Sequence, residues 1–167
     1  MYSKRSNLTD DFLTPPELVE AMGIFDLDPC ASRRQSAPLA RESYCYPEAD
    51  GLLLPWFGSV FVNPPFSQTR AWVQRFVLHG DGVLLCPARV ETDWFRPLWE
   101  YCDGIFFSHL CIKYGCPPGI HHAPGFFGGA FCAMGRGNAE RLSRLPLSGV
   151  VVTHRAVKRA SPLAAPF

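Results

Sequence analysis

The sequence lacks a large excess of charge of either sign. Its 167 residues include 16 Lys and Arg and 15 Asp and Glu, which gives a formal net charge of +1. A chain this close to neutral cannot be coated uniformly with basic charge, so a wholly basic surface is excluded as the main means of holding nucleic acid. Hydrophobic residues make up 47% and charged residues 19%, so the composition is that of an ordinary globular protein.

Long hydrophobic runs and paired cysteines are also missing. No stretch approaches the ~20 apolar residues that a membrane-spanning helix needs, and the first twelve residues contain no apolar signal core. The seven cysteines form no C-x-x-C pair, and Cys86 lies within an apolar run, which is typical of proteins in a reducing compartment. We therefore expect a cytoplasmic protein with no membrane partner.

The length leaves room for one well-packed core and not for two. We expect a single domain over residues 1–167, with mobile tails at 1–11 and 157–167. Aromatic residues are plentiful at 13%, and 16 prolines and 14 glycines indicate many loops. A compact, aromatic-rich domain without accessory modules follows from these counts.

Apolar segments that predict strands alternate with segments that predict helices. Helices are expected from Thr14 to Gly23, over residues 69–79, and from Thr92 or Asp93 to about Tyr101. Strands are expected over residues 24–28, 59–62, 83–86 and 105–107, with further candidates at 110–114 and 126–134. This alternation predicts the α/β class, with a mostly parallel sheet covered by helices on both faces.

Two unusual tetrapeptides follow strands of this predicted sheet. Asp28-Pro29-Cys30-Ala31 comes after the first strand, and Asn63-Pro64-Pro65-Phe66 comes after the second. Ligands of parallel α/β sheets bind at the carboxyl ends of the strands. We therefore expect both tetrapeptides at the ligand-binding edge of the sheet.

The chemistry of Asn63-Pro64-Pro65-Phe66 suits a planar amino group. Two successive prolines fix the backbone and remove two N–H donors, so carbonyl oxygens remain free to face a ligand. The amide oxygen of Asn63 and the carbonyl oxygen of Pro64 would accept the two hydrogens of an –NH2 group, and Phe66 would stack on a flat ring. The alternative is a strand terminator made of two prolines, with Phe66 in the core.

Short motifs follow one another in a fixed order through most of the chain. They are Thr14-Pro15-Pro16; residues 25–31 (FDLDPCA); Asp50-Gly51-Leu52 followed by Trp56; residues 62–66 (VNPPF); residues 85–89 (LCPAR); residues 93–95 (DWF); and Ala123-Pro124 before residues 126–131. Together they span roughly residues 12–134. Their order and spacing resemble the phage-type DNA N-6-adenine methyltransferase (Dam) family.

The resemblance implies a compact Rossmann-like class I methyltransferase that uses S-adenosylmethionine and acts on DNA. It also implies that the protein is a monomer or homodimer, that a phage or prophage encodes it, and that it works in a bacterial host cell. It implies a catalytic role for Asn63, Pro64, Pro65 and Phe66, with the adenine flipped out of the helix to reach them. Acceptance of both amine hydrogens frees the nitrogen lone pair for attack on the sulfonium methyl group, helped mainly by positioning. Such motifs also occur in methyltransferases that act on RNA or on a glutamine amide, and a non-catalytic nucleic-acid-binding protein of this fold is a further alternative.

The resemblance also places the cofactor. It implies contacts from Thr14 and Pro15, from Asp28-Pro29-Cys30-Ala31, with Asp28 near the ammonium group, and from Asp50, near the cofactor adenine. Glycines are missing after Asp28, where the wider superfamily has a glycine-rich turn. The alternatives are a helix cap for Thr14 and plain turns for Asp28 and Asp50. Glu42 and Glu48 are the candidates for the ribose hydroxyls.

Candidate DNA contacts are unevenly distributed. Arg89 and Lys113 lie near strand ends, and His122 lies in the turn-rich segment before the last predicted strand. Residues 133–167 carry six basic side chains and a single acidic one, which is a composition that contacts phosphate or forms a solvated terminus. No metal is expected, because His121-His122 has no second ligand pair at zinc-site spacing. No separate recognition domain fits, so we expect a short or loosely defined target sequence.

Overall fold

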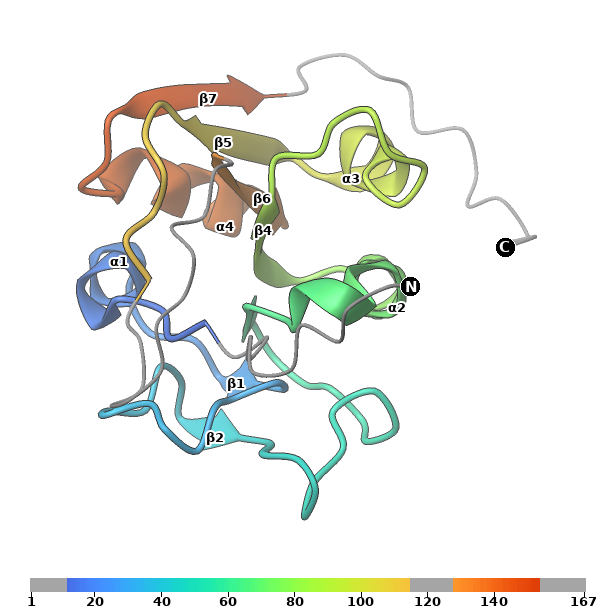
Figure 1. Ribbon diagram of the computed structural model, residues 1–167. Coiled ribbons are helices and arrows are strands. Elements are labelled where there is room, and N and C mark those ends of the chain that lie inside the picture. The colour runs from blue at the N-terminus through green and yellow to red at the C-terminus, as the bar shows by residue number, and fades with distance from the viewer. Residues whose placement is uncertain (1–11, 115–127, 154–167) are drawn as a thin grey trace, which may run out of the picture.

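The computed structural model describes residues 12–114 and 128–153, and these contain a seven-stranded mixed sheet. The strand order is β2-β1-β3-β4-β6-β5-β7 (Figure 1). The strands are β1 (Leu27–Asp28), β2 (Glu42–Ser43), β3 (Val60–Val62), β4 (Gly82–Pro87), β5 (Gly104–Ser108), β6 (Gly129–Met134) and β7 (Gly149–Thr153).

The strand directions correct the expected sheet. Strands β2, β1, β3 and β4 are parallel neighbours, whereas β6 is antiparallel to both β4 and β5, and β7 is antiparallel to β5. The antiparallel ladders are also the longer ones, so the prediction of a mostly parallel sheet is wrong. The physical reason is that β6 inserts between β4 and β5. A buried apolar run has the same pattern in either direction, so the sequence does not show this.

Helices pack on both faces of the sheet, as expected for the α/β class. They are α1 (Pro16–Met22), α2 (Thr69–His79), α3 (Arg96–Tyr101) and α4 (Arg136–Arg141), with 3-10 turns η1 (Phe66–Gln68) and η2 (Leu142–Arg144). Trp72 and Phe76 of α2 join Leu98 of α3 in one buried cluster, and Met22 of α1 joins Leu142 in the other. Figure 1 shows α1 and α4 on one side of the sheet and α2 and α3 on the other.

Several expected elements are confirmed and others are corrected. The helix over residues 69–79 is α2, and the strands expected at 83–86 and 105–107 lie within β4 and β5. Helix α1 begins at Pro16, and no side chain caps it, so Thr14 is not a helix cap. The segment 110–114 is not a strand.

The chain after β6 belongs to the fold as far as residue 153. The buried Asn138 of α4 donates to Asp81 Oδ1 (2.6 Å) and to the Met134 carbonyl (2.8 Å), which fixes α4 against the start of β4. The basic segment that begins at residue 133 is therefore not a solvated terminus up to this point. The expected tails at 1–11 and 157–167 lie outside the described residues.

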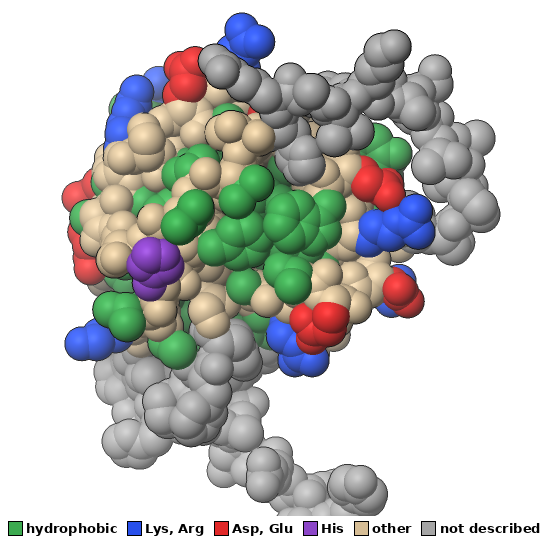
Figure 2. Space-filling view, turned by 90° about the horizontal axis from the view of Figure 1, so that it is seen from above, with side chains coloured by type: hydrophobic (Ala, Val, Ile, Leu, Met, Phe, Trp, Pro, Cys, Tyr) green, Lys and Arg blue, Asp and Glu red, His purple; other side chains and the backbone are tan. Residues whose placement is uncertain are grey.

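Strand β7 forms one edge of the sheet and leaves apolar side chains exposed. Val150 is 53% exposed and Val152 is 38% exposed. Figure 2 shows an apolar area on this end of the molecule with charged side chains near its border. Strand β2 forms the opposite edge. Among the described helices, none has the length and hydropathy needed to span a membrane.

Candidate functional site

The strand order reverses direction next to β1. From β1 the chain passes to β2 on one side of it, and later returns to place β3 on the other side. Crevices at such switch points, outside the carboxyl ends of the strands, are the usual ligand sites of α/β sheets. Asp28 ends β1 and Asn63 directly follows β3, so both residues lie at this point.

A cleft of about 790 Å³ opens there, within the range of small-molecule sites. It brings together most of the residues that the sequence nominated. Those that line it are Thr14, Asp28, Pro29, Cys30, Ala31, Asp50, Asn63 and Pro65. All four residues of Asp28-Pro29-Cys30-Ala31 and two of Asn63-Pro64-Pro65-Phe66 therefore line the same cleft.

Other nominated residues lie outside the cleft lining. Pro15 occupies the position before the first residue of α1, and Pro64 is buried between two residues that do line the cleft, Asn63 and Pro65. Phe66 opens the η1 turn and does not line the cleft.

Two of the nominated DNA-contacting residues, Arg89 and Lys113, also lie outside the cleft lining. Arg89 follows β4, is exposed, and pairs with Glu91 at 2.8 Å. Lys113 is exposed and does not line the cleft, and His122 lies outside the described residues. The cleft geometry therefore gives Arg89 and Lys113 no role in holding a small ligand.

The side chain of Asn63 is held in one orientation. Its Nδ2 donates to the Phe12 carbonyl oxygen at 2.9 Å and to Thr14 Oγ1 at 2.8 Å. Because a carbonyl oxygen can only accept, this contact fixes which end of the amide faces Phe12. The opposite atom, Asn63 Oδ1, is buried and has no hydrogen-bond partner among the described residues. An acceptor left in this state costs about 1–3 kcal/mol, a cost that a hydrogen-bond donor brought next to it would remove.

The prolines after Asn63 leave a second acceptor. The Pro65 carbonyl accepts from the Gln68 N–H at 3.0 Å and thereby starts η1. The carbonyl of Pro64, in contrast, accepts no hydrogen bond within the part of the chain that the structure describes. Neither proline can donate an N–H, so the motif offers acceptors and no competing donors.

Asp28 is a buried carboxyl group at the same strand edge. Its side chain is 5% exposed, and burial raises its pKa to about 7. Oδ1 accepts from the Cys30 N–H at 3.1 Å, and no Lys or Arg of the described residues pairs with it. A buried carboxylate without a counter-ion favours a cationic ligand, since a cation would restore the charged form. Burial, with the Asp28 charge, raises the pKa of the Cys30 thiol, which therefore stays neutral.

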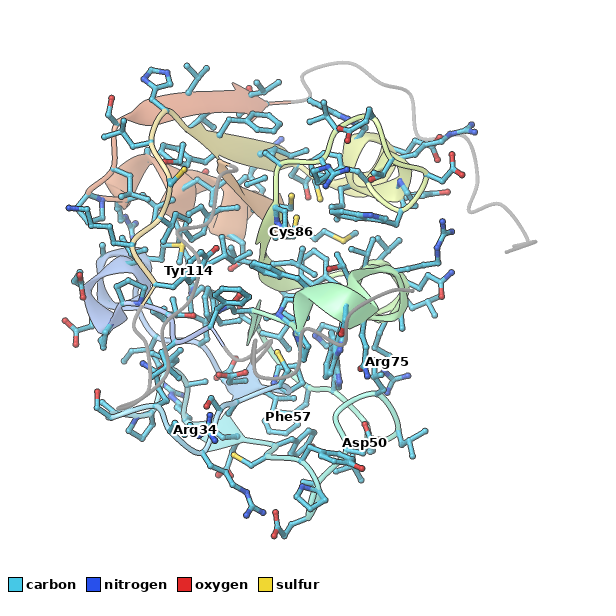
Figure 3. The ribbon with its side chains drawn as sticks, in the orientation of Figure 1. Arg34, Asp50, Phe57, Arg75, Cys86 and Tyr114 are labelled. Carbon is cyan, nitrogen blue, oxygen red and sulfur yellow. The ribbon has the colours of Figure 1, made fainter. Side chains whose placement is uncertain are left out.

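The Asp50 segment packs against the turn after β1. Asp50 Oδ1 accepts from the Leu52 N–H at 2.9 Å, and Trp56 Nε1 donates to the Gly51 carbonyl at 2.7 Å. A Cβ atom on Gly51 would overlap the carbonyl oxygen of Pro29, so only glycine allows this approach. The close approach between the Asp50 segment and the turn after Asp28 therefore depends on Gly51. Figure 3 labels Asp50 and Arg34, which both line the cleft.

Replacing Gly51 with alanine is expected to destabilise the protein by about 1–3 kcal/mol, since the new methyl group must displace the Pro29 backbone. Thermal unfolding measures the loss. Gly137→Ala is the matched control, because a Cβ there meets no atom within 4 Å and its melting temperature should not fall. An unchanged melting temperature for Gly51→Ala would contradict the packing described above.

Sequence reasoning missed several aromatic residues in the cleft lining and next to it. Phe12 lines the cleft and stacks on Phe66, with ring centroids 4.6 Å apart and planes inclined by 22°. Tyr114 packs against both rings, and burial raises the pKa of its hydroxyl (Figure 3). Trp72 of α2 also lines the cleft, and its buried Nε1 has no partner in the described ranges. The only sequence signal for Phe12 was its position two residues before Thr14.

Neither ribose candidate lines the cleft. Glu42 is exposed on β2, and Glu48 forms an ion pair with Arg33. Tyr44 and Tyr46, which follow β2, line the cleft instead. Within residues 12–114 and 128–153, no three His, Cys, Asp or Glu side chains are arranged to hold a metal ion, and His121-His122 lies outside these ranges.

Comparisons with family models, with curated proteins and with solved structures found no match to this chain.

Proposed function

We propose that the protein transfers a methyl group from S-adenosylmethionine to the N-6 amine of adenine in DNA. The observation that supports this proposal most is the hydrogen bonding of the Asn63 side-chain amide. Its amide nitrogen is fixed by Phe12 and Thr14, and its buried Oδ1 is left as an unpaired acceptor at a cleft of suitable size. An exocyclic amine is the group that such an acceptor would bind.

Two acceptors would govern how the amine reacts, one on Asn63 in the cleft lining and one on Pro64 beside it. The lone pair of an adenine amine is delocalised into the ring, which makes the nitrogen a poor nucleophile. Hydrogen bonds from its two hydrogens to Asn63 Oδ1 and to the Pro64 carbonyl would favour a tetrahedral nitrogen and localise the lone pair. The nitrogen then forms a bond to the methyl carbon while the carbon–sulfur bond breaks, and the amine proton leaves to solvent. Positioning supplies most of the acceleration.

Two carboxyl groups of the cleft support the proposed cofactor. S-adenosylmethionine supplies an electrophilic methyl group when it is bound. Asp28, buried without a counter-ion, would hold its ammonium group, and the half-buried Asp50 would accept from its adenine amine. Ala31 and Cys30 would line the turn next to the methionine portion.

The strand directions support the finer, Rossmann-like description of the fold. Strands β4 and β5 are both antiparallel to β6, so they run in the same direction as each other. Strands β2, β1, β3, β4 and β5 therefore all point one way, with a switch point between β1 and β3. The proposed cofactor site at this switch point is where such folds bind nucleotides.

Cofactor binding is expected to strengthen as the pH rises from 5.5 to 7.5. With an Asp28 pKa of about 7, most of the free protein carries a neutral carboxyl at pH 5.5, and only the ionised form attracts the ammonium group. The affinity should therefore increase about 20-fold over this interval, in which an α-amino group stays largely cationic. It should stop rising above pH 7.5, because the α-amino group then loses its proton. Calorimetry with S-adenosylmethionine at three pH values measures this. An affinity that is constant from pH 5.5 to 7.5 would contradict the role of Asp28.

Transfer of a labelled methyl group tests the proposal against its rivals. The protein is incubated with labelled S-adenosylmethionine and a mixture of unmethylated DNA, RNA and protein, and the label is located after separation. We expect label in DNA alone. Label in RNA adenine or on a glutamine amide would favour those substrates, which also present a planar amino group. Failure to bind the cofactor would favour a non-catalytic nucleic-acid-binding protein.

A further inference from the structure

We propose that strand β7 pairs edge to edge, in the antiparallel direction, with β7 of a second copy of this chain. The inference does not depend on the proposed function, because it concerns the end of the sheet that lies away from the cleft. Among the described strands, β7 is the last at its end of the sheet and pairs only with β5. Figure 1 shows no labelled element beyond it.

The direction of each backbone group of β7 follows from the register with β5. Just before β7, the carbonyl oxygen of Ser148 accepts from the His109 N–H at 2.9 Å, so the groups of Ser148 face β5. The backbone groups of an antiparallel strand point alternately to its two sides. Every second residue after Ser148 therefore faces β5 as well. The three residues that direct their N–H and carbonyl groups away from the sheet are Gly149, Val151 and Thr153.

This outward edge is unpaired and carries none of the usual protection. The outward groups of the three residues make no hydrogen bond within the described chain. Free edges of monomeric proteins are commonly protected by charged side chains, prolines or bulges. Strand β7 has the sequence GVVVT and five successive register pairs with β5, without a bulge. The opposite edge strand, β2, has two residues, and one of them is the exposed Glu42.

A second copy fits this edge because the outward residues are arranged symmetrically about Val151. When Val151 lies opposite its own copy, Gly149 of each strand lies opposite Thr153 of the other. Each of these pairs can exchange two backbone hydrogen bonds, as hydrogen-bonded pairs of an antiparallel ladder do. A two-fold interface of this kind is self-complementary and closes after two copies.

The side chains of β7 suit the same two-fold arrangement. Val150 is 53% exposed and Val152 is 38% exposed, on the face opposite to Val151, which packs against the core. In this register Val150 of each copy lies opposite Val152 of the other, in the closely spaced pairs of the ladder. Because β7 carries no charged side chain, the two-fold axis brings no like charges of the strand together.

The size of the contact predicts a weak dimer. A strand of five residues is about 17 Å long, so the paired edges bury less than the roughly 800 Å² per partner of a standard interface. Interfaces below that size are typical of transient complexes. We therefore expect a dimer that forms at high micromolar concentration and dissociates on dilution. The cleft should stay open in it, because β4, β6 and β5 separate β3 from β7.

Sedimentation equilibrium of the full chain, from low micromolar to near-millimolar concentration, tests the proposal. The mass should rise from 18.6 kDa toward twice that value. The double variant Val150→Lys/Val152→Lys places lysine opposite lysine of the other copy and should stay monomeric. Val150→Lys/Val152→Glu places lysine opposite glutamate and should restore the dimer. Val90→Lys, at a 47% exposed valine outside β7, is the matched control and should dimerise like wild type.

Hydrogen exchange of the wild-type amides, followed by NMR, tests the register without any substitution. The outward amides of Gly149, Val151 and Thr153 should exchange rapidly in dilute solution and several-fold more slowly at high concentration. The amides of Val150 and Val152 should be protected at both concentrations, because they face β5. This alternation is the signature of pairing along the outer edge of β7.

Three results would overturn the proposal. A mass of 18.6 kDa at every concentration would show that no dimer forms. A dimer that persists in Val150→Lys/Val152→Lys would place the interface elsewhere on the molecule. Slow exchange of the outward amides in the monomer would show that another segment of the same chain covers the edge. None of these measurements involves methyl transfer, so their failure is distinguishable from failure of the proposed function.

Discussion

Replacing Asn63 with alanine is expected to reduce methyl transfer to DNA by at least about a hundredfold, the usual effect of removing one positioned hydrogen-bonding group from a reaction centre. The loss has a defined source, because Oδ1 is the buried acceptor that has no partner within the described chain. The binding of S-adenosylmethionine should change by less than about threefold, since Asp28 and Asp50 remain. Single-turnover transfer of a labelled methyl group measures the first quantity, and calorimetry measures the second.

The combination of the two measurements separates catalysis from folding. A variant that binds the cofactor normally and transfers no methyl group has kept its cleft and lost only the acceptor. Equal transfer rates for Asn63→Ala and wild type would refute the role of Asn63. Loss of both functions, together with a lower melting temperature, would show that the hydrogen bonds from Nδ2 to Phe12 and Thr14 hold the cleft together instead.

Replacing Asp28 with asparagine is expected to weaken cofactor binding and to stabilise the free protein. Removal of one partner from a buried charge pair costs about 2–5 kcal/mol, so the affinity for S-adenosylmethionine should fall at least about 30-fold. The same substitution should raise the free energy of unfolding of the free protein. The pKa of Asp28 is raised in the folded state, so between about pH 4 and pH 7 the folded protein binds more protons than the unfolded chain.

The free energy of unfolding of the wild-type protein therefore falls as the pH rises through this window. Above pH 7 the charged, buried Asp28 costs up to about 4 kcal/mol, and the neutral amide of the Asp28→Asn variant avoids this cost. The melting temperature of the variant should exceed that of wild type at pH 8 and match it at pH 4. Asp93→Asn, the same charge change at an exposed position, should leave the melting temperature unchanged at both pH values. A variant that is less stable than wild type at pH 8 would contradict the account of Asp28.

The parts of the fold that the sequence predicts best are those with strong local signals. Helix α2 has a full apolar stripe over three turns and is correct at both ends. Helix α4 has six residues and strand β7 five, which is too short for a clear period, and neither was expected. The direction of β6 depends on the insertion between β4 and β5, and a local pattern carries no information about it.

In the candidate site, too, some features follow from local sequence signals and others from contacts between distant residues. Asp28 and Asn63 could be placed together because each follows a strand, and strand ends meet at one edge of a sheet. The hydrogen bond from Asn63 to Thr14 joins residues 49 positions apart, and Phe12 reaches the site through the same segment. Contacts of this kind arise only when α1 has packed onto its face of the sheet. The sequence therefore indicated several of the residues that line the cleft, and the fold determined the contacts that join them.

The central claim is that adenine in DNA receives the methyl group on its exocyclic amine. The most direct test is to incubate wild-type protein with S-adenosylmethionine and unmethylated DNA, digest the DNA to nucleosides, and quantify each methylated nucleoside by mass spectrometry. We predict that N-6-methyldeoxyadenosine accumulates with time and that no other methylated nucleoside appears. DNA that remains unmethylated, although the same preparation binds the cofactor, would contradict the account.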